Sequence, residues 1–199
     1  MNFSNTSGVL QFDDGSMLLI NVNDLNIGAI TMTGGAHDDQ LIASWTQNDR
    51  LVGNAGNDLL IGGGGDNQMY GGSGNDTLFG WGGNDYMSGG SGSDTFVVYG
   101  GSLFGATNGH DTISDFTAGP GGDMLDIADA VTLAAAGINF DGGGHLVASA
   151  NVVQSGADTL ILLSGSGVDS VRLMGVTLTN LTTTNFDNTH FNIDNGSSI

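Results

Sequence analysis

Aspartates recur at a nine-residue spacing in residues 34–97, and most lie a few residues after glycine. The sixth position of the repeat is Asp in six of seven cases: Asp39, Asp49, Asp58, Asn67, Asp76, Asp85 and Asp94. Carboxylate and main-chain carbonyl oxygens are the ligands that Ca²⁺ prefers, and glycine lets a tight turn direct successive carbonyls toward one point. The spacing therefore indicates a series of calcium sites.

The net charge supports a role for cations. The chain has 2 Lys+Arg against 21 Asp+Glu, every acid is Asp, and the formal net charge is −19. Such a charge argues against nucleic acid and anionic membrane surfaces as partners, and it makes a compact chain repel itself unless cations neutralise it. We therefore expect calcium as the partner that the fold requires.

Residues suited to catalysis are missing or scattered. Without Glu there is no HExxH motif, and without Cys there is no thiol nucleophile or cysteine zinc site. The four histidines share no ligand spacing, and no GxSxG motif occurs. We expect no enzymatic activity.

The repeat comprises seven nonapeptides, with one extra residue, Ala43, after the first. The units are 34–42, 44–52, 53–61, 62–70, 71–79, 80–88 and 89–97. Position eight is always large and apolar: Leu41, Leu51, Leu60, Met69, Leu78, Met87 and Phe96. A glycine-rich disordered linker would not keep an apolar position seven times, so a folded repeat architecture is favoured.

These units resemble the GGxGxDxUx nonapeptide of the repeats-in-toxin (RTX) family, in which U is a large apolar residue. The resemblance implies an all-β fold, a calcium-loaded parallel β-roll in which GGxGxD is a turn and xUx a short strand. Two nonapeptides complete one coil, so odd-numbered units form the turns of one side and even-numbered units those of the other. Position eight would point inward and form the core.

The resemblance also implies the ligands of each ion. They are the carbonyls of positions two and four and the Asp of position six in one turn, with the carbonyls of positions one and three and the Asp of the turn one coil later. On the odd side the ligand sets are Gly35, His37, Asp39, Gly53, Ala55 and Asp58; Asn54, Gly56, Asp58, Gly71, Ser73 and Asp76; and Gly72, Gly74, Asp76, Gly89, Ser91 and Asp94.

The even side departs from this pattern, since Asn67 replaces Asp, Gln47 replaces Gly, and Trp45 and Trp81 occupy position two. Unit two retains the acid of position six, Asp49. The set Gly63, Gly65, Asn67, Gly80, Gly82 and Asp85 retains less charge. We expect the two sides to differ in affinity for calcium.

The flanks are expected to complete the roll. Residues 1–33 show two or three alternating strands, with a turn at 13–15, that would cap the first coil. Residues 98–130 resemble the segment that closes the roll in secreted RTX proteins, where Asp111, Asp115 and Asp123 are candidate ligands of a last ion. A GPGG insertion at 119–122 departs from that segment.

Residues 131–199 are expected to be a C-terminal β region. Two alternating strands joined at 164–167 are predicted, with a short helix at 134–136. The region resembles the uncleaved C-terminal signal of proteins exported by the type I secretion machinery; a simple β cap is the alternative. No N-terminal secretory signal and no membrane span are recognisable.

The outward face of the roll is unusually apolar. Position nine reads Ile42, Val52, Ile61, Tyr70, Phe79, Ser88 and Val97, where a free sheet face should be polar. Cover by flanking strands of the same chain is one explanation, and self-association through this face is the other. Trp45 and Trp81 are expected two coils apart, roughly 10 Å, in contact with a partner or packed on the turns.

Two functions fit these observations. The first is a secreted calcium-binding RTX protein that folds outside the cell and has a structural or assembly role in a surface layer, matrix or filament; the initial Met and the lack of room for an enzyme domain favour it. The second is the C-terminal calcium-binding and secretion module of a larger RTX enzyme, such as a protease, lipase or epimerase, or of an adhesin.

Overall fold

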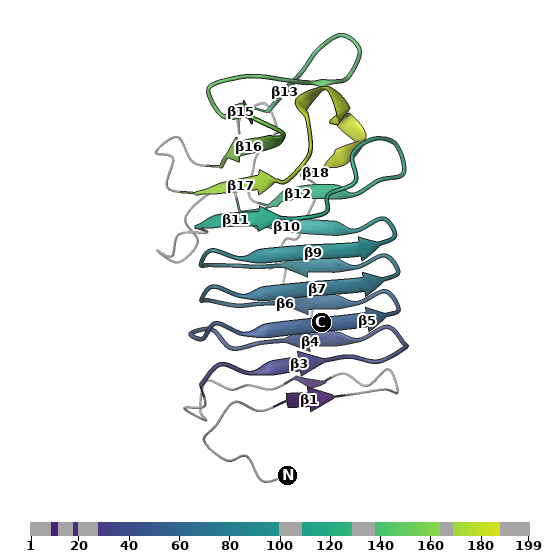
Figure 1. Cartoon of the computed structure of the whole chain (residues 1–199), viewed down its shortest axis with the longest axis vertical. Helices are drawn as coiled ribbons and strands as arrows, with labels where there is room; N and C mark the ends of the chain where they lie inside the picture. The colour runs from purple at the N-terminus through teal and green to yellow at the C-terminus, as the bar shows by residue number, and fades with distance from the viewer. Residues whose placement is uncertain are drawn as a thin grey trace.

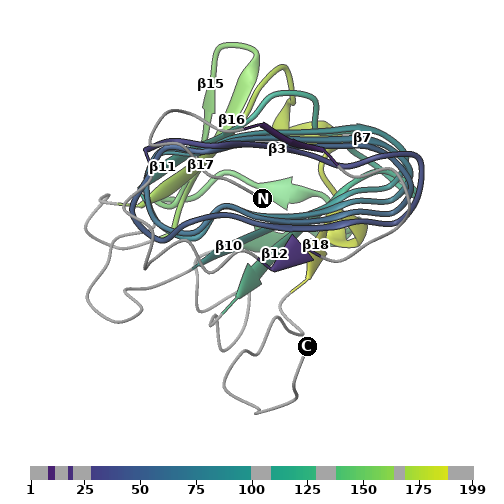
Figure 2. The same cartoon turned by 90° about the horizontal axis from the view of Figure 1, so that it is seen from below.

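The chain forms a parallel β-roll of two facing sheets, as seen in a computed structural model (Figures 1 and 2). The structure describes residues 9–11, 18–19, 28–99, 109–128, 138–163 and 169–187. Strands stack one above another along the long axis, and the view along that axis shows the two sheets as layers of a flattened ring. The all-β roll expected from the repeat is confirmed.

Odd-numbered and even-numbered units supply different sheets. The nine-stranded sheet has the order β1-β3-β5-β7-β9-β11-β17-β16-β15, and the seven-stranded sheet has the order β18-β12-β10-β8-β6-β4-β2. The strands of the first are Val9–Gln11, Thr31–Thr33, Arg50–Ala55, Gln68–Ser73, Tyr86–Ser91, His110–Ile113, Ser170–Leu173, Asp158–Leu162 and Val152–Ser155. The strands of the second are Phe186–Asp187, Met124–Ala128, Thr95–Tyr99, Thr77–Phe79, Leu59–Ile61, Gln40–Ile42 and Leu18–Leu19.

The core lies between the two sheets and is built from position eight. Every residue at that position is almost fully buried, from Leu41 at 1% exposure to Phe96 at 0%. Side chains alternate across a strand, so position eight points inward while positions seven and nine point outward. Register places these residues directly beside one another, as in the series Leu60, Leu78 and Phe96. Position eight therefore forms one continuous apolar column for each sheet.

The strands before the repeat lengthen the roll by parallel pairing. β1 pairs with β3, β3 pairs with β5, and β2 pairs with β4. Met32 lies beside Leu51 and is fully buried, so it occupies a core position like that of position eight. The predicted strands are thus present, whereas the turn expected at 13–15 lies outside the described residues.

The strands after the repeat add one more coil. β12 pairs in parallel with β10 and places Leu125 beside Phe96, while β11 pairs with β9 and places Ile113 beside Met87. Both apolar residues are fully buried. The closing segment therefore continues the register of the repeat, although its sequence no longer matches GGxGxD.

A C-terminal β region covers the end of the roll (Figure 1). β16 and β17, the two strands predicted on either side of 164–167, pair antiparallel, and β15 pairs antiparallel with β16. A small hairpin of β13 (Asn139–Phe140) and β14 (Leu146–Val147) and the 3₁₀ helices η2 (Leu178–Asn180) and η3 (Thr183–Asn185) complete the region. The helix expected at 134–136 lies outside the described residues.

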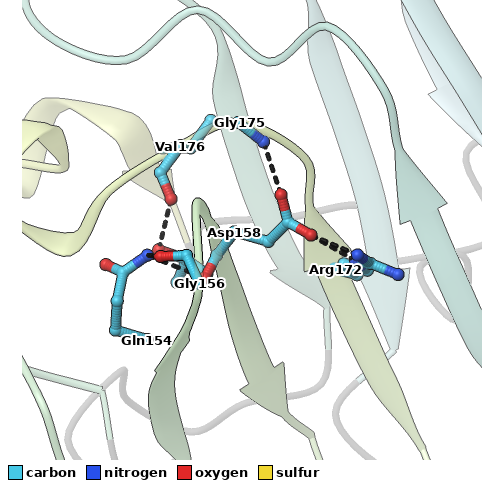
Figure 3. Close-up of polar contacts among 7 residues, drawn as sticks. Gln154, Gly156, Asp158, Arg172, Gly175 and Val176 are labelled. Atoms are coloured by element: carbon cyan, nitrogen blue, oxygen red, sulfur yellow. Dashed lines mark hydrogen bonds and ion pairs between the residues drawn. The ribbon is translucent and has the colours of Figure 1, made fainter.

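Asp158 fastens this region together (Figure 3). One carboxylate oxygen accepts hydrogen bonds from Arg172 Nε at 2.7 Å and from Arg172 Nη2, and the other accepts the Gly175 N–H at 2.8 Å. The N–H of Gly175 and then the side chain of Arg172 hold the pKa of Asp158 below its usual value. Gln154 adds a bond from Nε2 to the Asp158 carbonyl at 2.8 Å. The β15–β16 hairpin is thereby tied to β17 and the turn after it.

The two outer faces of the roll differ. On the seven-stranded sheet, Phe79 and Val97 are 0% and 1% exposed and cluster with Ile61 and Ala128. Position nine of this sheet is thus buried at Ile61, Phe79 and Val97 and partly buried at Ile42. On the nine-stranded sheet, Val52, Tyr70 and Ser88 keep part of their surface in solvent, and Tyr86 at position seven is 39% exposed.

Candidate calcium sites

The aspartates of the odd turns form a buried ladder. The backbone N–H of Asp39 donates to Oδ1 of Asp58, that of Asp58 to Oδ1 of Asp76, and that of Asp76 to Oδ1 of Asp94, at 2.8, 2.8 and 2.9 Å. All four residues are at most 2% exposed. The carboxylates of Asp58, Asp76 and Asp94 therefore each have one oxygen fixed by the turn before it. In Asp39, Oδ2 accepts the Gly35 N–H of its own turn and Oδ1 has no hydrogen bond.

The first step of this ladder tolerates the extra residue. Ala43 lies outside the turn, is buried, and donates its N–H to the Ile61 carbonyl at 2.8 Å. The spacing from Asp39 to Asp58 becomes 19 residues instead of 18, yet the hydrogen bond between them is retained. The bond between the first two odd turns is thus kept, although Asp39 differs from the later aspartates in that its Oδ2 accepts the Gly35 N–H.

The second carboxylate oxygen of these aspartates faces a cradle that only glycine leaves open. Oδ2 of Asp58, Asp76 and Asp94 is buried and accepts no hydrogen bond. A Cβ added at Gly53 or Gly71 would lie 2.1 or 2.2 Å from the Oδ2 of its own turn and 2.6 Å from the position-one carbonyl of the next turn. A buried, negatively charged oxygen without a donor beside a carbonyl oxygen fits a bound cation.

The predicted carbonyl ligands lie at the interface of consecutive odd turns. Position-four oxygens point to the following turn, since those of His37, Gly56 and Gly74 lie 2.6, 1.9 and 1.8 Å from a Cβ built on the next position-four glycine. Position-one oxygens point back in the same manner, those of Gly53, Gly71 and Gly89 at 2.7, 2.6 and 2.6 Å from a Cβ on the preceding turn. The position-one carbonyls of Gly71 and Gly89 therefore lie beside Oδ2 of Asp58 and Asp76, and the position-four carbonyls lie against the next odd turn.

The remaining predicted ligands take part in pairing between coils. Position-three carbonyls of Ser73 and Ser91 accept the N–H groups of Gly56 and Gly74 at 2.9 Å, and the Gly35 carbonyl accepts the Ala55 N–H at 3.1 Å. Asn54 pairs with Gly72, and the backbone carbonyl oxygen of Asn54 would lie 2.0 Å from a Cβ built on Gly72. These groups hold the turns in register.

The even turns form a second ladder whose atoms are used differently. Its N–H to Oδ1 bonds run from Asp49 to Asn67, from Asn67 to Asp85 and from Asp85 to Asp111. Oδ2 of Asp49 accepts both the N–H and the hydroxyl of Ser44, at 3.0 and 2.7 Å. Only Asp85 of the even repeat aspartates keeps a buried Oδ2 without a donor. The expected asymmetry between the sides has a structural basis.

Two of the three candidate acids in the closing segment continue the ladders. Asp123 Oδ1 accepts the N–H of Asp94 at 2.9 Å on the odd side, and Asp111 receives that of Asp85 on the even side. Asp115 is placed differently, because it accepts the Ser88 hydroxyl and the N–H groups of Gly89 and Gly90 at 2.6, 3.1 and 2.9 Å.

Sequence analysis missed a further acid, Asp169. Its Oδ1 accepts the N–H of Gly109 at 3.0 Å, and the residue is 3% exposed. The signal was the SGSGVDSV stretch at 164–171, which has the glycine and Asp order of one more unit. The donor is Gly109 and not Asp111, and Asp111 lies beside Val171, so Asp169 lies two residues out of register with the even ladder.

Position five carries an exposed ladder that was also missed. On the odd side, Oδ1 of Asp38 accepts the Asn57 N–H, Asn57 accepts from Asn75, and Asn75 accepts from Ser93. On the even side, Asn48, Asp66 and Asn84 accept in turn from the residues one coil later, ending at His110. The recurrence of Asn or Asp before the buried Asp was the signal, since both accept a backbone N–H in turns.

Burial shifts the proton affinity of the buried ladder. Desolvation raises the pKa of Asp58, Asp76 and Asp94 from 3.8 to about 6, and that of Asp85 to about 7, against the lowering effect of the N–H donors. Neighbouring carboxylates add to the increase. Burial also raises the pKa of Asp123. Full ionisation of the buried carboxyl groups is therefore unfavourable unless a cation is bound.

The two tryptophans contact one another. Their ring centroids are 4.8 Å apart in an edge-on arrangement, and Trp81 stacks on Phe79 at 4.9 Å. The separation of roughly 10 Å expected from strand spacing is therefore wrong for the rings, because the side chains lean across the intervening glycine turn. They pack on the turns, and Trp45 keeps 47% of its surface exposed.

Within the described residues there is no group of three His, Cys, Asp or Glu side chains arranged to hold a metal ion. Cages of the predicted kind need only two carboxylates each, because carbonyls supply the other ligands. The described part of the chain also contains no helix that is long and apolar enough to cross a membrane.

Comparison with known proteins agrees with this geometry. The RTX calcium-binding nonapeptide repeat (four copies) matches residues 46–78 and 61–96. This part of the chain is therefore an RTX repeat, and calcium is the ion that such repeats bind. No curated protein matches the chain.

Among solved structures, the crystal structure of extracellular lipase LipA from Serratia marcescens is similar at 16% identity and a TM-score of 0.38. The match covers 80% of this chain and 38% of the lipase chain. This chain thus aligns with well under half of the length of that protein.

The cradle can be tested with one methyl group. Gly71→Ala places a Cβ against Asp76 Oδ2 and the Gly89 carbonyl, so we expect a loss of about 1–3 kcal/mol in the free energy of unfolding in calcium. Gly142→Ala is the control, because a Cβ there has no atom within 4 Å. Denaturant unfolding measures both, and equal stability of the two variants would contradict the cradle.

The raised pKa values predict how the metal-free chain depends on pH. A carboxyl whose pKa is higher in the folded state stabilises the fold below its unfolded pKa of 3.8 and loses this contribution as pH rises through about 6 to 7. Lowering the pH from 7.5 to 5 should therefore increase the β structure of metal-free protein in circular dichroism. Less β structure at pH 5 than at pH 7.5 would show the opposite linkage.

Proposed function

We propose that this chain is a secreted, calcium-dependent folding module in which ions bound between the odd turns hold the roll together. The observation that carries the proposal is the stack of buried Oδ2 atoms of Asp58, Asp76 and Asp94, which accept no hydrogen bond and face glycine cradles lined by carbonyl oxygens. Calcium supplies the positive charge that this oxygen-only environment needs.

Folding and binding are linked in this proposal. Bringing the aspartates into one ladder places like charges in a buried stack on a chain of net charge −19. Without calcium their repulsion opposes the fold, whereas an ion that binds only the folded roll stabilises it in proportion to ln(1 + [Ca²⁺]/Kd). Extracellular calcium modules have Kd values on the order of 10⁻⁴ to 10⁻³ M. Such a chain would be loose inside the cell and ordered outside it.

The role that we propose for the folded module is structural, in a surface layer, matrix or filament, and not catalytic. The buried aspartates take part in ladders between coils, which is an architectural use of carboxylates. Export would use the type I secretion machinery and a signal in the C-terminal region. A chain kept loose by charge repulsion suits passage through an export channel.

A calcium titration followed by circular dichroism tests the proposal. Wild-type protein should gain most of its β signal on addition of calcium and lose it in excess chelator. Asp76→Asn should raise the calcium midpoint by roughly tenfold, because Asp76 contributes to the interface with the turn before it and to that with the turn after it.

Asp66→Asn is the matched control. It removes the same charge from an exposed turn position, and Asn can still accept the N–H of Asn84. A midpoint like that of the wild type is expected for this variant. Full β structure of the wild type in excess chelator at neutral pH, or equal midpoints for the two variants, would contradict the proposal.

A further inference from the structure

Asn67 turns a donor group toward the space that an ion would occupy. Its Oδ1 accepts the N–H of Asp49 at 2.8 Å, which fixes the orientation of the amide. Its Nδ2 then takes the place of the free carboxylate oxygen of the odd turns, 2.7 Å from a Cβ built on Gly62. The ion-facing atom of this turn therefore carries hydrogens instead of a negative charge.

The amide also uses a predicted calcium ligand. Nδ2 of Asn67 donates to the Gly65 carbonyl at 2.9 Å, and the residue is only 1% exposed. Reversing the amide would set NH₂ against the Asp49 N–H and oxygen against the Gly65 carbonyl, so both bonds would be lost. The side chain is thus satisfied in one orientation and leaves no oxygen directed at a cation.

The neighbouring step of the even ladder is closed as well. Oδ2 of Asp49, the atom that corresponds to the free oxygen of Asp58 or Asp76, is held by the N–H and the hydroxyl of Ser44. Ser44 occupies position one, where the odd turns have the glycine of the cradle. Two different substitutions, Ser44 and Asn67, thereby produce the same result in consecutive turns.

Aromatic contacts strengthen the same turns. Trp81 occupies position two with a φ of 72°, a left-handed conformation that is rare for a large side chain. The contacts of its ring with Trp45 and Phe79 offset this strain and span the turns of units two to six. Hydrogen bonds and ring packing thus hold together the even turns of units two to six, whereas the odd turns have open glycine cradles.

We propose that the spaces between the even turns of units two and four and of units four and six are closed by the Ser44 and Asn67 hydrogen bonds and bind no calcium. The space after unit six, where Asp85 Oδ2 has no donor, is not closed in this way. The proposal rests on the calcium-dependent function proposed above. It assigns the turns of units two to six on the even side as held together without calcium, in contrast to the odd turns.

Counting bound ions by native mass spectrometry at saturating calcium tests this assignment. Asn67→Asp restores a carboxylate between Gly62 and the Gly80 carbonyl and should bind one more ion than the wild type. Asn75→Asp adds the same charge at an exposed position whose oxygen accepts the Ser93 N–H, so it should bind the wild-type number. Equal counts for wild type and Asn67→Asp would overturn the proposal.

Asn67→Ala provides a second measurement if the aspartate variant does not fold. It removes the amide without supplying a ligand, so the number of ions should equal that of the wild type. The loss of an ion in Asn67→Ala would show that Asn67 supports one, and would overturn the proposal. A wild-type chain that binds no calcium would instead contradict the proposed function, so the two failures are distinguishable.

Discussion

The hydrogen bond from the backbone N–H of one Asp to the carboxylate of the Asp one coil later is the interaction on which the rest of the roll depends. It fixes the register of the turns, and with it the alignment of position eight in the core. It also forces carboxylates of like charge into a buried stack, as at Asp58, Asp76 and Asp94. The fold thereby creates an electrostatic cost that a cation in the stack would offset.

The two sides of the roll meet this constraint in different ways. On the odd side Asp58, Asp76 and Asp94 each keep a free oxygen beside a glycine cradle, and burial raises the pKa of Asp76 to about 6. In units two and four of the even side, Ser44 and Asn67 provide the hydrogen bonds of the equivalent atoms. A single repeat can therefore combine turns that need a cation with turns that do not, while the core between the sheets remains continuous.

Periodicity predicted much of this architecture from sequence. A fixed spacing of Asp and of position eight was enough to predict the roll, the division into odd and even turns, and the inward face of Leu60 or Phe96. The buried contact of Asp169 with the Gly109 N–H was not predicted, because hydrogen bonds between coils tolerate many turn sequences. The burial of Phe79 and the Trp45 contact depend on side-chain packing between elements, which strand periodicity alone does not specify.

The central claim is that calcium lies between consecutive odd turns. Anomalous diffraction from crystals grown in calcium tests it most directly, because the signal locates each ion independently of the protein model used for phasing. The account predicts anomalous peaks between Asp58 and Asp76 and between Asp76 and Asp94, within coordination distance of both carboxylates. A folded roll with no peak at these two positions would contradict it.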